Sequence, residues 1–173
     1  MKNTLLIASL LLFSSVVLAQ TNYRTEYRQH PTFTYDVGAA SGSYNGNNYS
    51  EINLGFNWYF SDAVAWRNSL FTRFGTGVDS ATGVDSSLRY TYNTDARATL
   101  GLGFFAGGGY RLTKTQDAGP FAEGGLTLRA GGLSVGAGIK EIFYPSPGTD
   151  SNGGKLPDHD STVFLILAGG GVF

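Results

Sequence analysis

The sequence predicts an all-β protein, an eight-stranded antiparallel up-and-down transmembrane β-barrel. Beyond residue 31 the chain alternates apolar and polar residues in short runs and contains no convincing amphipathic helix. Charged residues make up only 14% of the chain, against roughly 25% in an average soluble domain. Glycine occurs 25 times, about twice its usual share of roughly 7%. These figures indicate a protein whose outer surface does not need to be ionic.

The N-terminal residues have the pattern of a secretory signal peptide. Lys2 precedes an apolar run that ends in small residues at Ala19, so residues 1–19 are expected to be removed. The apolar run is too short to be a stable spanning helix. Residues 20–31 are then a short periplasmic segment, and residues 32–173 form the barrel. The chain has no cysteine, which excludes a disulfide scaffold and a thiolate metal site.

Eight alternating runs follow one another along the chain. The links after the first, third, fifth and seventh runs are long and polar, and the other three are short. Short turns at one end and long loops at the other are typical of bacterial outer-membrane barrels, in which the short side is periplasmic. The predicted strands are residues 32–40, 51–60, 64–74, 87–92, 97–112, 121–129, 133–143 and 161–173.

The boundaries of these strands come from turn residues, taken here in chain order. SGSYNGNNYS separates the first two strands, and Ser61-Asp62-Ala63 joins the second to the third. GTGVDSATGVDSS and then residues 93–96 flank the fourth strand. TKTQDAG precedes the sixth strand, Gly131-Gly132 follows it, and YPSPGTDSNGGKLPDHD leads into the last. The Gly-Gly pair suits a two-residue turn with positive φ.

The register of two hairpins can be predicted from their turns. Centring the first on Asp62 places Trp58 opposite Trp66 on one face and Glu51 opposite Arg73 on the other. Centring the second on the Gly-Gly pair places Glu123 opposite Lys140. Opposite charges therefore meet across both hairpins, as favourable cross-strand pairs should.

The polar face of the strands is predicted to line the barrel interior, the lumen. An eight-stranded barrel is only just wide enough for side chains to fill it, and the large residues of the apolar face would overfill it. We expect ion pairs in the lumen, with Glu123 pairing with Lys140 and Arg111, and Glu51 pairing with Arg73. These pairs would satisfy the lining of a closed barrel, or they could exchange partners and open a narrow gated channel for small molecules.

The apolar face is predicted to contact lipid. A soluble barrel of the lipocalin kind would bury this face instead, but it would then wet a face that is rich in glycine, which weakens a strand. Aromatic residues gather beside the short turns, where a membrane barrel carries a girdle at the lipid interface. The expected girdle residues are Trp58, Phe60, Trp66, Tyr90 and Tyr92.

With its signal peptide, alternating strands and terminal Phe173, the chain resembles the small outer-membrane barrels of the OmpA/OmpX type. The resemblance is one of architecture, and Gly169 and Gly171 stand where such terminal strands usually carry aromatic residues. It implies an outer-membrane location in a Gram-negative bacterium and a monomeric protein. The implied partners are outer-membrane lipid, lipopolysaccharide and the outer-membrane assembly machinery.

Two further groups of residues could carry chemistry. His159 and Ser161 fall on one face of the last strand, as a nucleophile and its base would require. This spacing is similar to the His-x-Ser of outer-membrane lipid A deacylases, but the Asn and the later acid of that family are missing here. Five acids in the second and fourth long links form a predicted acidic rim that could bind a divalent cation, although no defined calcium loop is present. They are Asp79, Asp85, Asp150, Asp158 and Asp160.

The sequence therefore favours a non-enzymatic outer-membrane protein with a structural or surface-interaction role. No catalytic residue, metal or cofactor is expected. Lys and Arg number 12 against 13 Asp and Glu, and this near-neutral balance without basic clusters gives no footprint for nucleic acid. The alternatives are the narrow gated channel and, less favoured, a lipid A-modifying hydrolase that uses His159 and Ser161.

Overall fold

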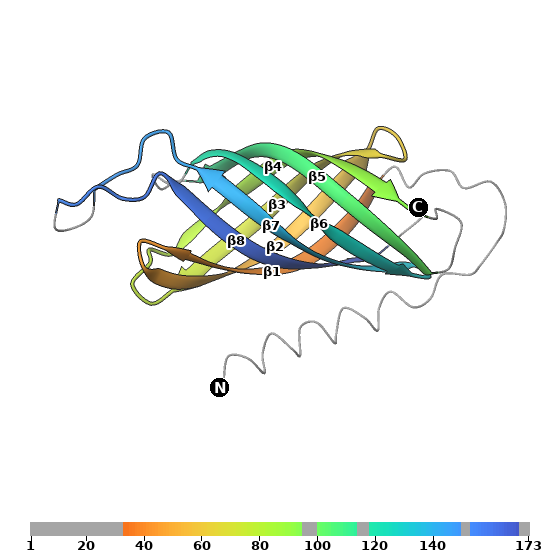
Figure 1. Ribbon diagram of the computed structural model, residues 1–173, viewed down its shortest axis with the longest axis horizontal. Coiled ribbons are helices and arrows are strands. Elements are labelled where there is room, and N and C mark those ends of the chain that lie inside the picture. Colours follow the sequence, from red (N-terminus) through yellow and green to blue (C-terminus); the bar gives the residue numbers. More distant parts are fainter. Residues whose placement is uncertain (1–32, 95–99, 114–117, 150–152, 170–173) are drawn as a thin grey trace.

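The protein is a closed barrel of eight antiparallel strands in which each strand pairs with its neighbours in the chain and β1 pairs with β8 (Figure 1). The computed structural model describes residues 33–94, 100–113, 118–149 and 153–169. The predicted fold class is thus confirmed. The strands are β1 Phe33–Tyr44, β2 Asn47–Tyr59, β3 Val64–Gly75, β4 Ala81–Asn93, β5 Leu100–Thr113, β6 Gly119–Ala130, β7 Leu133–Phe143 and β8 His159–Gly169.

The connections lie alternately at the two ends of the barrel. We call the end with the β2–β3, β4–β5 and β6–β7 connections the turn end, and the opposite end the loop end. Within the described residues, no helix is long and apolar enough to cross a membrane. The predicted signal peptide, the periplasmic segment and Phe173 lie outside the described residues.

The first connection at the loop end differs from the prediction. Residues 41–50 were expected to be a long loop, but β1 and β2 continue to a two-residue turn at Asn45 and Gly46. Both turn residues have positive φ, 50° and 76° respectively. Asn-Gly is the favoured pair for such a turn because its twist matches that of the flanking strands. The long-loop prediction is therefore wrong here, and a hairpin signal was present in the sequence.

The second connection is also shorter than predicted. Residues 75–86 were expected to be loop, but β4 already begins at Ala81. The long link between β7 and β8, residues 144–158, remains outside the strands and carries a single bridge between Thr149 and Lys155. The difference in connection length between the two ends of the barrel therefore comes mainly from the β7–β8 link.

The predicted registers are confirmed in both hairpins. Trp58 lies opposite Trp66, and Glu51 lies opposite Arg73 across β2 and β3. Glu123 lies opposite Lys140 across β6 and β7. A slip by one residue would exchange the two faces of a strand, so this register decides which side chains enter the lumen.

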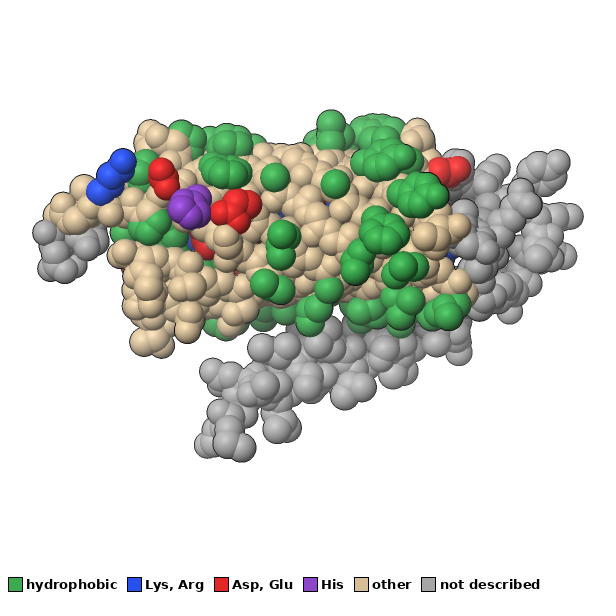
Figure 2. Space-filling model, viewed as in Figure 1, with side chains coloured by type: hydrophobic (Ala, Val, Ile, Leu, Met, Phe, Trp, Pro, Cys, Tyr) green, Lys and Arg blue, Asp and Glu red, His purple; other side chains and the backbone are tan. Residues whose placement is uncertain are grey.

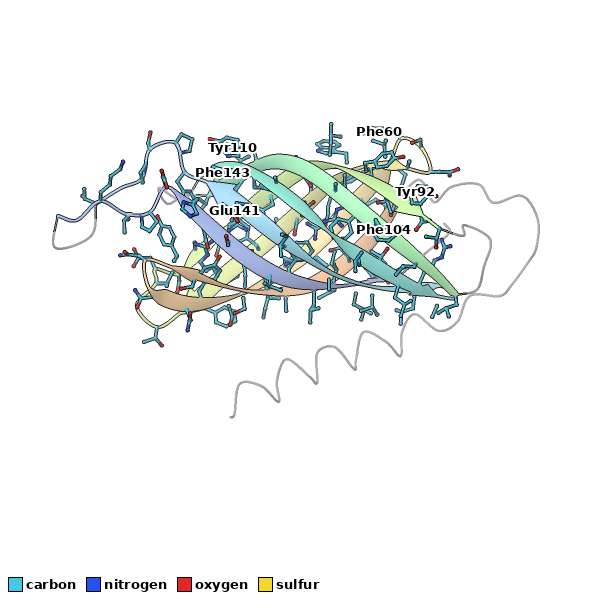
Figure 3. All side chains as sticks on the ribbon, viewed as in Figure 1. Phe60, Tyr92, Phe104, Tyr110, Glu141 and Phe143 are labelled. Carbon is cyan, nitrogen blue, oxygen red and sulfur yellow. The ribbon has the colours of Figure 1, made fainter. Side chains whose placement is uncertain are left out.

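Large apolar side chains cover the outside of the barrel, and buried charged side chains fill the inside. Figure 2 shows green apolar patches at both ends of one face, with mostly small or polar surface between them. Labelled aromatics occupy both ends of the wall, with Phe60, Tyr92 and Phe104 near the turn end and Tyr110 and Phe143 near the loop end (Figure 3). An apolar exterior over a polar interior is the arrangement of a membrane barrel.

All five residues expected in the aromatic girdle lie on the outer wall near the turn end. Their exposed fractions range from 40% for Trp58 to 66% for Phe60. The rings of Trp58 and Trp66 are 5.7 Å apart between centroids, so the predicted cross-strand pair is a ring contact. The five residues are Trp58, Phe60, Trp66, Tyr90 and Tyr92.

Glycine makes room for a lumenal ion pair at Gly55. A Cβ atom built there would lie 2.6 Å from Oδ2 of Asp36 and 2.7 Å from Nη2 of Arg67, far inside van der Waals contact. On the outer wall, by contrast, a Cβ at Gly124 would meet the carbonyl oxygen of Phe105 at an ordinary 3.5 Å. Close packing in the lumen therefore requires glycine at position 55, whereas packing on the outer wall does not require it at position 124.

We expect Gly55→Val to destabilise the barrel by about 1–3 kcal/mol, because the added methyl groups overpack the lumen. The matched control is Gly124→Val, which adds the same groups to the open outer wall and should leave stability almost unchanged. Urea unfolding of both variants in detergent micelles, followed by tryptophan fluorescence, measures the difference. Equal midpoints for the two variants would contradict the steric role of Gly55.

Candidate functional site

Among the residues that the structure describes, ten charged side chains are buried in the lumen, five cationic and five acidic, so that their formal charges cancel. Several of them belong to strands that lie far apart around the ring, and their ion pairs cross the lumen. We call this set the lumenal column. Its members are Asp36, Glu51, Arg67, Arg73, Asp85, Arg89, Arg111, Glu123, Lys140 and Asp160.

Arg111 of β5 is the centre of the lumenal column. Its Nε and Nη2 atoms donate to the two carboxylate oxygens of Asp85 at 2.7 Å each. Its Nη1 and Nη2 atoms donate to Glu51 of β2 at 3.0 and 2.8 Å. One guanidinium thus holds two carboxylates in fork-like pairs, the strongest geometry for such bonds.

Two further bridges join strands that are three apart around the ring. Lys140 of β7 donates to Asp85 of β4 at 2.6 Å. Arg73 of β3 donates to Asp160 of β8 at 3.1 Å, and its Nε atom lies 3.5 Å from Glu51. Together with Arg111, these contacts tie β2 to β5, β3 to β8 and β4 to β7.

Two pairs continue the column. Arg67 donates to Asp36 at 2.6 and 3.1 Å, and Asn57 adds a bond of 2.9 Å to the same carboxylate. Arg89 donates to Glu123 through two nitrogens at 2.9 and 3.1 Å. Burying a charge is costly unless it is paired and hydrogen-bonded, and these contacts supply that pairing.

Four of the lumenal cations also lie over aromatic rings. Their charged groups are 3.9 to 5.0 Å from the ring centroids, within the range of a cation–π contact. The rings fill space beside each cation as well as attracting it. The pairs are Arg73 over Tyr49, Arg89 over Phe105, Arg111 over Phe71 and Lys140 over Phe121.

The structure buries all five residues predicted to form lumenal ion pairs but rearranges their partners. Glu51 lies beside Arg73, as expected. Arg111, however, binds Glu51 and Asp85 rather than Glu123. Lys140 binds Asp85, and Glu123 binds Arg89. Residues directly opposite in register are not always ion partners, because long side chains reach across the lumen instead.

The sequence reasoning missed two acids of the lumenal column. Asp85 and Asp160 were expected on an exposed acidic rim, but each is only 1% exposed. Extending the alternation of Ser87 and Arg89 back through β4 would have placed Asp85 on the inner face. Asp158 is exposed in the last link, Asp79 lies between β3 and β4, and Asp150 is outside the described residues. The described residues contain no group of three metal-ligating side chains.

An apolar cluster closes the lumen at the loop end. Val78 of the β3–β4 connection and Leu156 of the β7–β8 link pack against this cluster. Two tyrosines of the cluster, Tyr49 and Tyr144, donate hydrogen bonds of 2.7 and 3.2 Å to Asp160 below. Burial raises the pKa of Tyr144, so its hydroxyl remains a donor. The cluster is Tyr44, Tyr49, Phe121, Ile142 and Tyr144.

A second group of polar residues lies on the outer wall at the loop end. His159 and Ser161 share the outer face of β8, and Ser161 donates a short hydrogen bond to Glu141 of β7. His159 Nδ1 is 3.0 Å from Asp158 Oδ1. That hydrogen bond lowers the pKa of Asp158. The sequence reasoning paired His159 with Ser161 but missed Glu141, which the β7–β8 register brings opposite Ser161.

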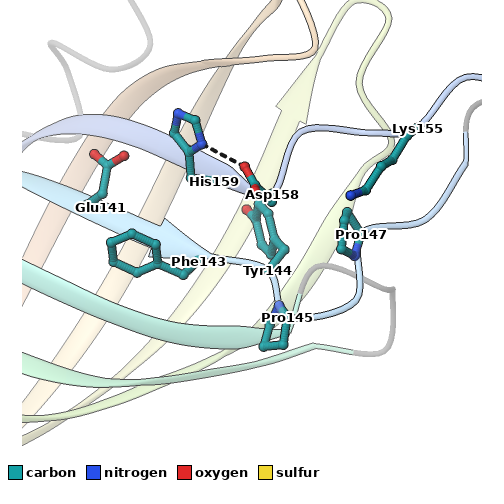
Figure 4. Close-up of a pocket in the computed structure, with 8 residues that line it drawn as sticks. All are labelled: Glu141, Phe143, Tyr144, Pro145, Pro147, Lys155, Asp158 and His159. Atoms are coloured by element: carbon teal, nitrogen blue, oxygen red, sulfur yellow. Dashed lines mark hydrogen bonds and ion pairs between the residues drawn. The ribbon is translucent and has the colours of Figure 1, made fainter.

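An open pocket of about 650 Å³ adjoins this group (Figure 4). Its walls are aromatic and proline residues from the end of β7 and the following link, together with charged residues of both signs. In Figure 2 acidic side chains flank the histidine at this end of the barrel. The lining residues are Glu141, Phe143, Tyr144, Pro145, Pro147, Lys155, Asp158 and His159.

We expect Arg111→Met to destabilise the barrel by about 3–5 kcal/mol, because it leaves Glu51 and Asp85 buried without their shared partner. Lys155→Met is the control, since it removes a cation from the exposed last link and should change stability by no more than about 0.5 kcal/mol. Urea unfolding in micelles measures both. An unchanged midpoint for Arg111→Met would show that the lumenal column does not hold the barrel together.

Comparison with known proteins supports the fold. No protein-family model matches the chain, and no curated protein matches it. A de novo designed transmembrane β-barrel is similar, with a TM-score of 0.51 and 12% identity, over 82% of this chain and 99% of that one. The outer-membrane enzyme PagL is similar with a TM-score of 0.49 and 16% identity, over 77% of this chain and 97% of that one. The likeness to the designed barrel, together with the closed ring of eight strands, shows the fold of a transmembrane β-barrel.

Proposed function

We propose that the protein is an integral outer-membrane barrel of the OmpA/OmpX type that acts through its outer surface and not as a channel. Its role is then structural or one of surface interaction, without catalysis. The observation that carries this proposal is the lumenal column, in which five cations and five acids cancel in charge across the barrel. A conducting pore needs a continuous path of water, and these side chains occupy that path.

The geometry of the bridges supports a closed lumen. Arg111 links β2, β4 and β5 through two carboxylates, so its removal from the path would break four hydrogen bonds at once. The apolar cluster adds a second barrier at the loop end. Because partner exchange would have to pass through unpaired buried charges, the gated-channel alternative is disfavoured.

The outer wall supports a membrane location. Exposed aromatic residues gather at the turn end, where they would form the periplasmic girdle. The loop end would then face outward and meet lipopolysaccharide. As a membrane barrel the chain would depend on the outer-membrane assembly machinery.

The proposal is tested by fractionation followed by reconstitution. We expect the protein in the outer-membrane fraction, with a gel mobility that shifts on heating, and no stepwise conductance in planar bilayers. The variant Arg111→Ala/Glu51→Ala/Tyr49→Ala/Tyr144→Ala, which empties the middle of the lumen and opens the apolar cluster without changing net charge, should conduct, and the control Lys155→Ala should not. Stepwise conductance from the wild-type protein would overturn the closed-lumen proposal.

A second candidate function is hydrolysis of a lipid acyl ester at the outer wall. The observation that favours it is the hydrogen bond from Ser161 to the Glu141 carboxylate. Glu141 would take the Ser161 proton while Oγ attacks the acyl carbonyl carbon, and the proton would pass to the alcohol released as the ester bond breaks. Water would then release the acyl group from the serine. His159, held by Asp158, lies two residues away on the same face.

The hydrolase candidate predicts that the purified barrel releases free fatty acid from radiolabelled acyl-ester lipid in mixed micelles. Ser161→Ala should abolish the release. The control is Ser43→Ala, which alters an exposed serine in register with Ser161 on the neighbouring strand β1. If wild-type protein releases no fatty acid, or if both variants release it equally, this candidate is excluded.

A further inference from the structure

The outer wall has a hollow over β6 and β7, between the middle of these strands and the loop end. Its volume is about 550 Å³. One charged outward side chain, Glu141, lies at its edge. The other outward residues of the lining are apolar, so the hollow is an apolar surface that ends in a carboxylate. They are Ala122, Gly124, Leu126 and Ile139.

The packing of the strands does not require small residues in this part of the wall. A Cβ atom at Gly124 would touch only the carbonyl oxygen of Phe105, at an ordinary 3.5 Å. Elsewhere the outer wall carries large exposed side chains, such as Leu102, Leu112 and Leu165. A large residue at position 124 would fill the hollow, and the hollow is therefore a property of the surface and not a by-product of the fold.

Glu141 lies on the wall that would face lipid, and not beyond it. On β7 it stands between two outward apolar residues, Ile139 and Phe143, and Figure 3 places both Glu141 and Phe143 near the loop end. Two residues of a strand span about 7 Å, so Glu141 is attached about that far inside Phe143. Aromatic residues of a membrane barrel mark the interface. The carboxylate therefore lies near the depth at which acyl chains join a lipid headgroup.

One oxygen of this carboxylate can accept a further hydrogen bond. Ser161 of β8 lies opposite Glu141 in register and donates a hydrogen bond to its Oε2 atom. In the part of the chain that the structure describes, no group donates to Oε1. An ionised carboxylate can only accept hydrogen bonds, and away from water an acceptor without a donor is costly. The edge of the hollow is thus complementary to a lipid group that donates a hydrogen bond.

We propose that the hollow binds one acyl chain of lipopolysaccharide, with a hydroxyl group of that chain donating to Oε1 of Glu141. Acyl chains of lipopolysaccharide carry hydroxyl groups near their linkage to the sugar, which supplies a donor at this depth. The ester linkages of an ordinary phospholipid offer only acceptor oxygens there, and these would leave the carboxylate without a donor. This inference rests on the proposed membrane orientation, in which the loop end faces lipopolysaccharide, but on neither the closed lumen nor the hydrolase candidate.

The shape of the hollow suits a single chain. Its volume falls within the range of about 300–1,000 Å³ that is usual for ligand pockets. The larger side chains of Leu126 and Ile139 border the small residues Ala122 and Gly124, so a chain that lies over the small residues also contacts the flanks of the larger ones. Each enclosed methylene group adds van der Waals contacts. The hydroxyl group at Glu141 then fixes the position of the chain along the strands.

The test uses two probes that differ by one hydroxyl group, N-(β-hydroxymyristoyl)glucosamine and N-myristoylglucosamine. Native mass spectrometry of the intact barrel, released from detergent micelles that contain either probe, measures how much of each is retained. We expect the hydroxylated probe to be retained at least several-fold more than its counterpart. Purified lipid A, the acylated sugar of lipopolysaccharide, should displace it, whereas an equal concentration of phosphatidylethanolamine should not.

Two variants test the two parts of the site. Glu141→Leu should lower the retention of the hydroxylated probe to that of its counterpart, because the acceptor is lost. Gly124→Leu should lower the retention of both probes by a similar factor, because its side chain fills the hollow. The matched controls are Thr72→Leu, which replaces an outward polar residue of β3 on the opposite side of the ring, and Ala39→Leu on the outer face of β1. Neither control should change retention.

Equal retention of the two probes by the wild-type protein, or the same loss in the control variants, would overturn the proposal. Displacement by phosphatidylethanolamine as effective as that by lipid A would also overturn it. Retention of a probe only after it has lost its acyl chain would do the same, and would support the hydrolase candidate. A gel mobility shift on heating shows that each variant is folded. Because retention is measured in micelles, its failure is distinct from any result of the fractionation and conductance experiments.

Discussion

The interaction on which the rest of the structure depends is the grip of Arg111 on two carboxylates. Its guanidinium binds Asp85 on the neighbouring strand and Glu51 across the lumen. A narrow barrel must fill its interior with side chains, and here the filling is ionic. Once Arg111 holds both acids, Lys140 and Arg73 complete the pairing of the same two carboxylates. Because the charged side chains are paired inside the barrel, the side chains that face outward can be apolar.

Much of the fold could be predicted because alternation with period two fixes the face of every strand residue once the register is known. The limits appear where local sequence is ambiguous. The pentapeptide TGVDS occurs twice; residues 76–80 lie outside the strands, whereas residues 82–86 belong to β4. Only pairing with β3 and β5 distinguishes the second copy. That is why Asp85 was assigned to a loop although it belongs to the lumen.

The site was predictable in composition but not in connectivity. The alternation of apolar and polar residues placed five charged residues on the inner face, and all five are buried in the lumen: Glu51, Arg73, Arg111, Glu123 and Lys140. Their partners depend on which side chains reach across the barrel, and this depends on strand tilt and stagger, which no single hairpin reveals. On the outer wall, likewise, His159 and Ser161 could be placed on one face, but their neighbour Glu141 is brought to them by the pairing of β7 with β8.

The distribution of ion partners along the chain has a consequence for assembly. Arg73 is delivered by β3, but Asp160, its hydrogen-bonded partner, arrives only with the last strand. Asp85 of β4 likewise gains its partner Lys140 only when β7 has joined the barrel. A hairpin that entered the bilayer alone would carry these charges without their partners, at a cost of several kcal/mol for each ion. Strand closure and charge neutralisation must therefore occur together, so that the chain becomes compatible with lipid only as a completed ring.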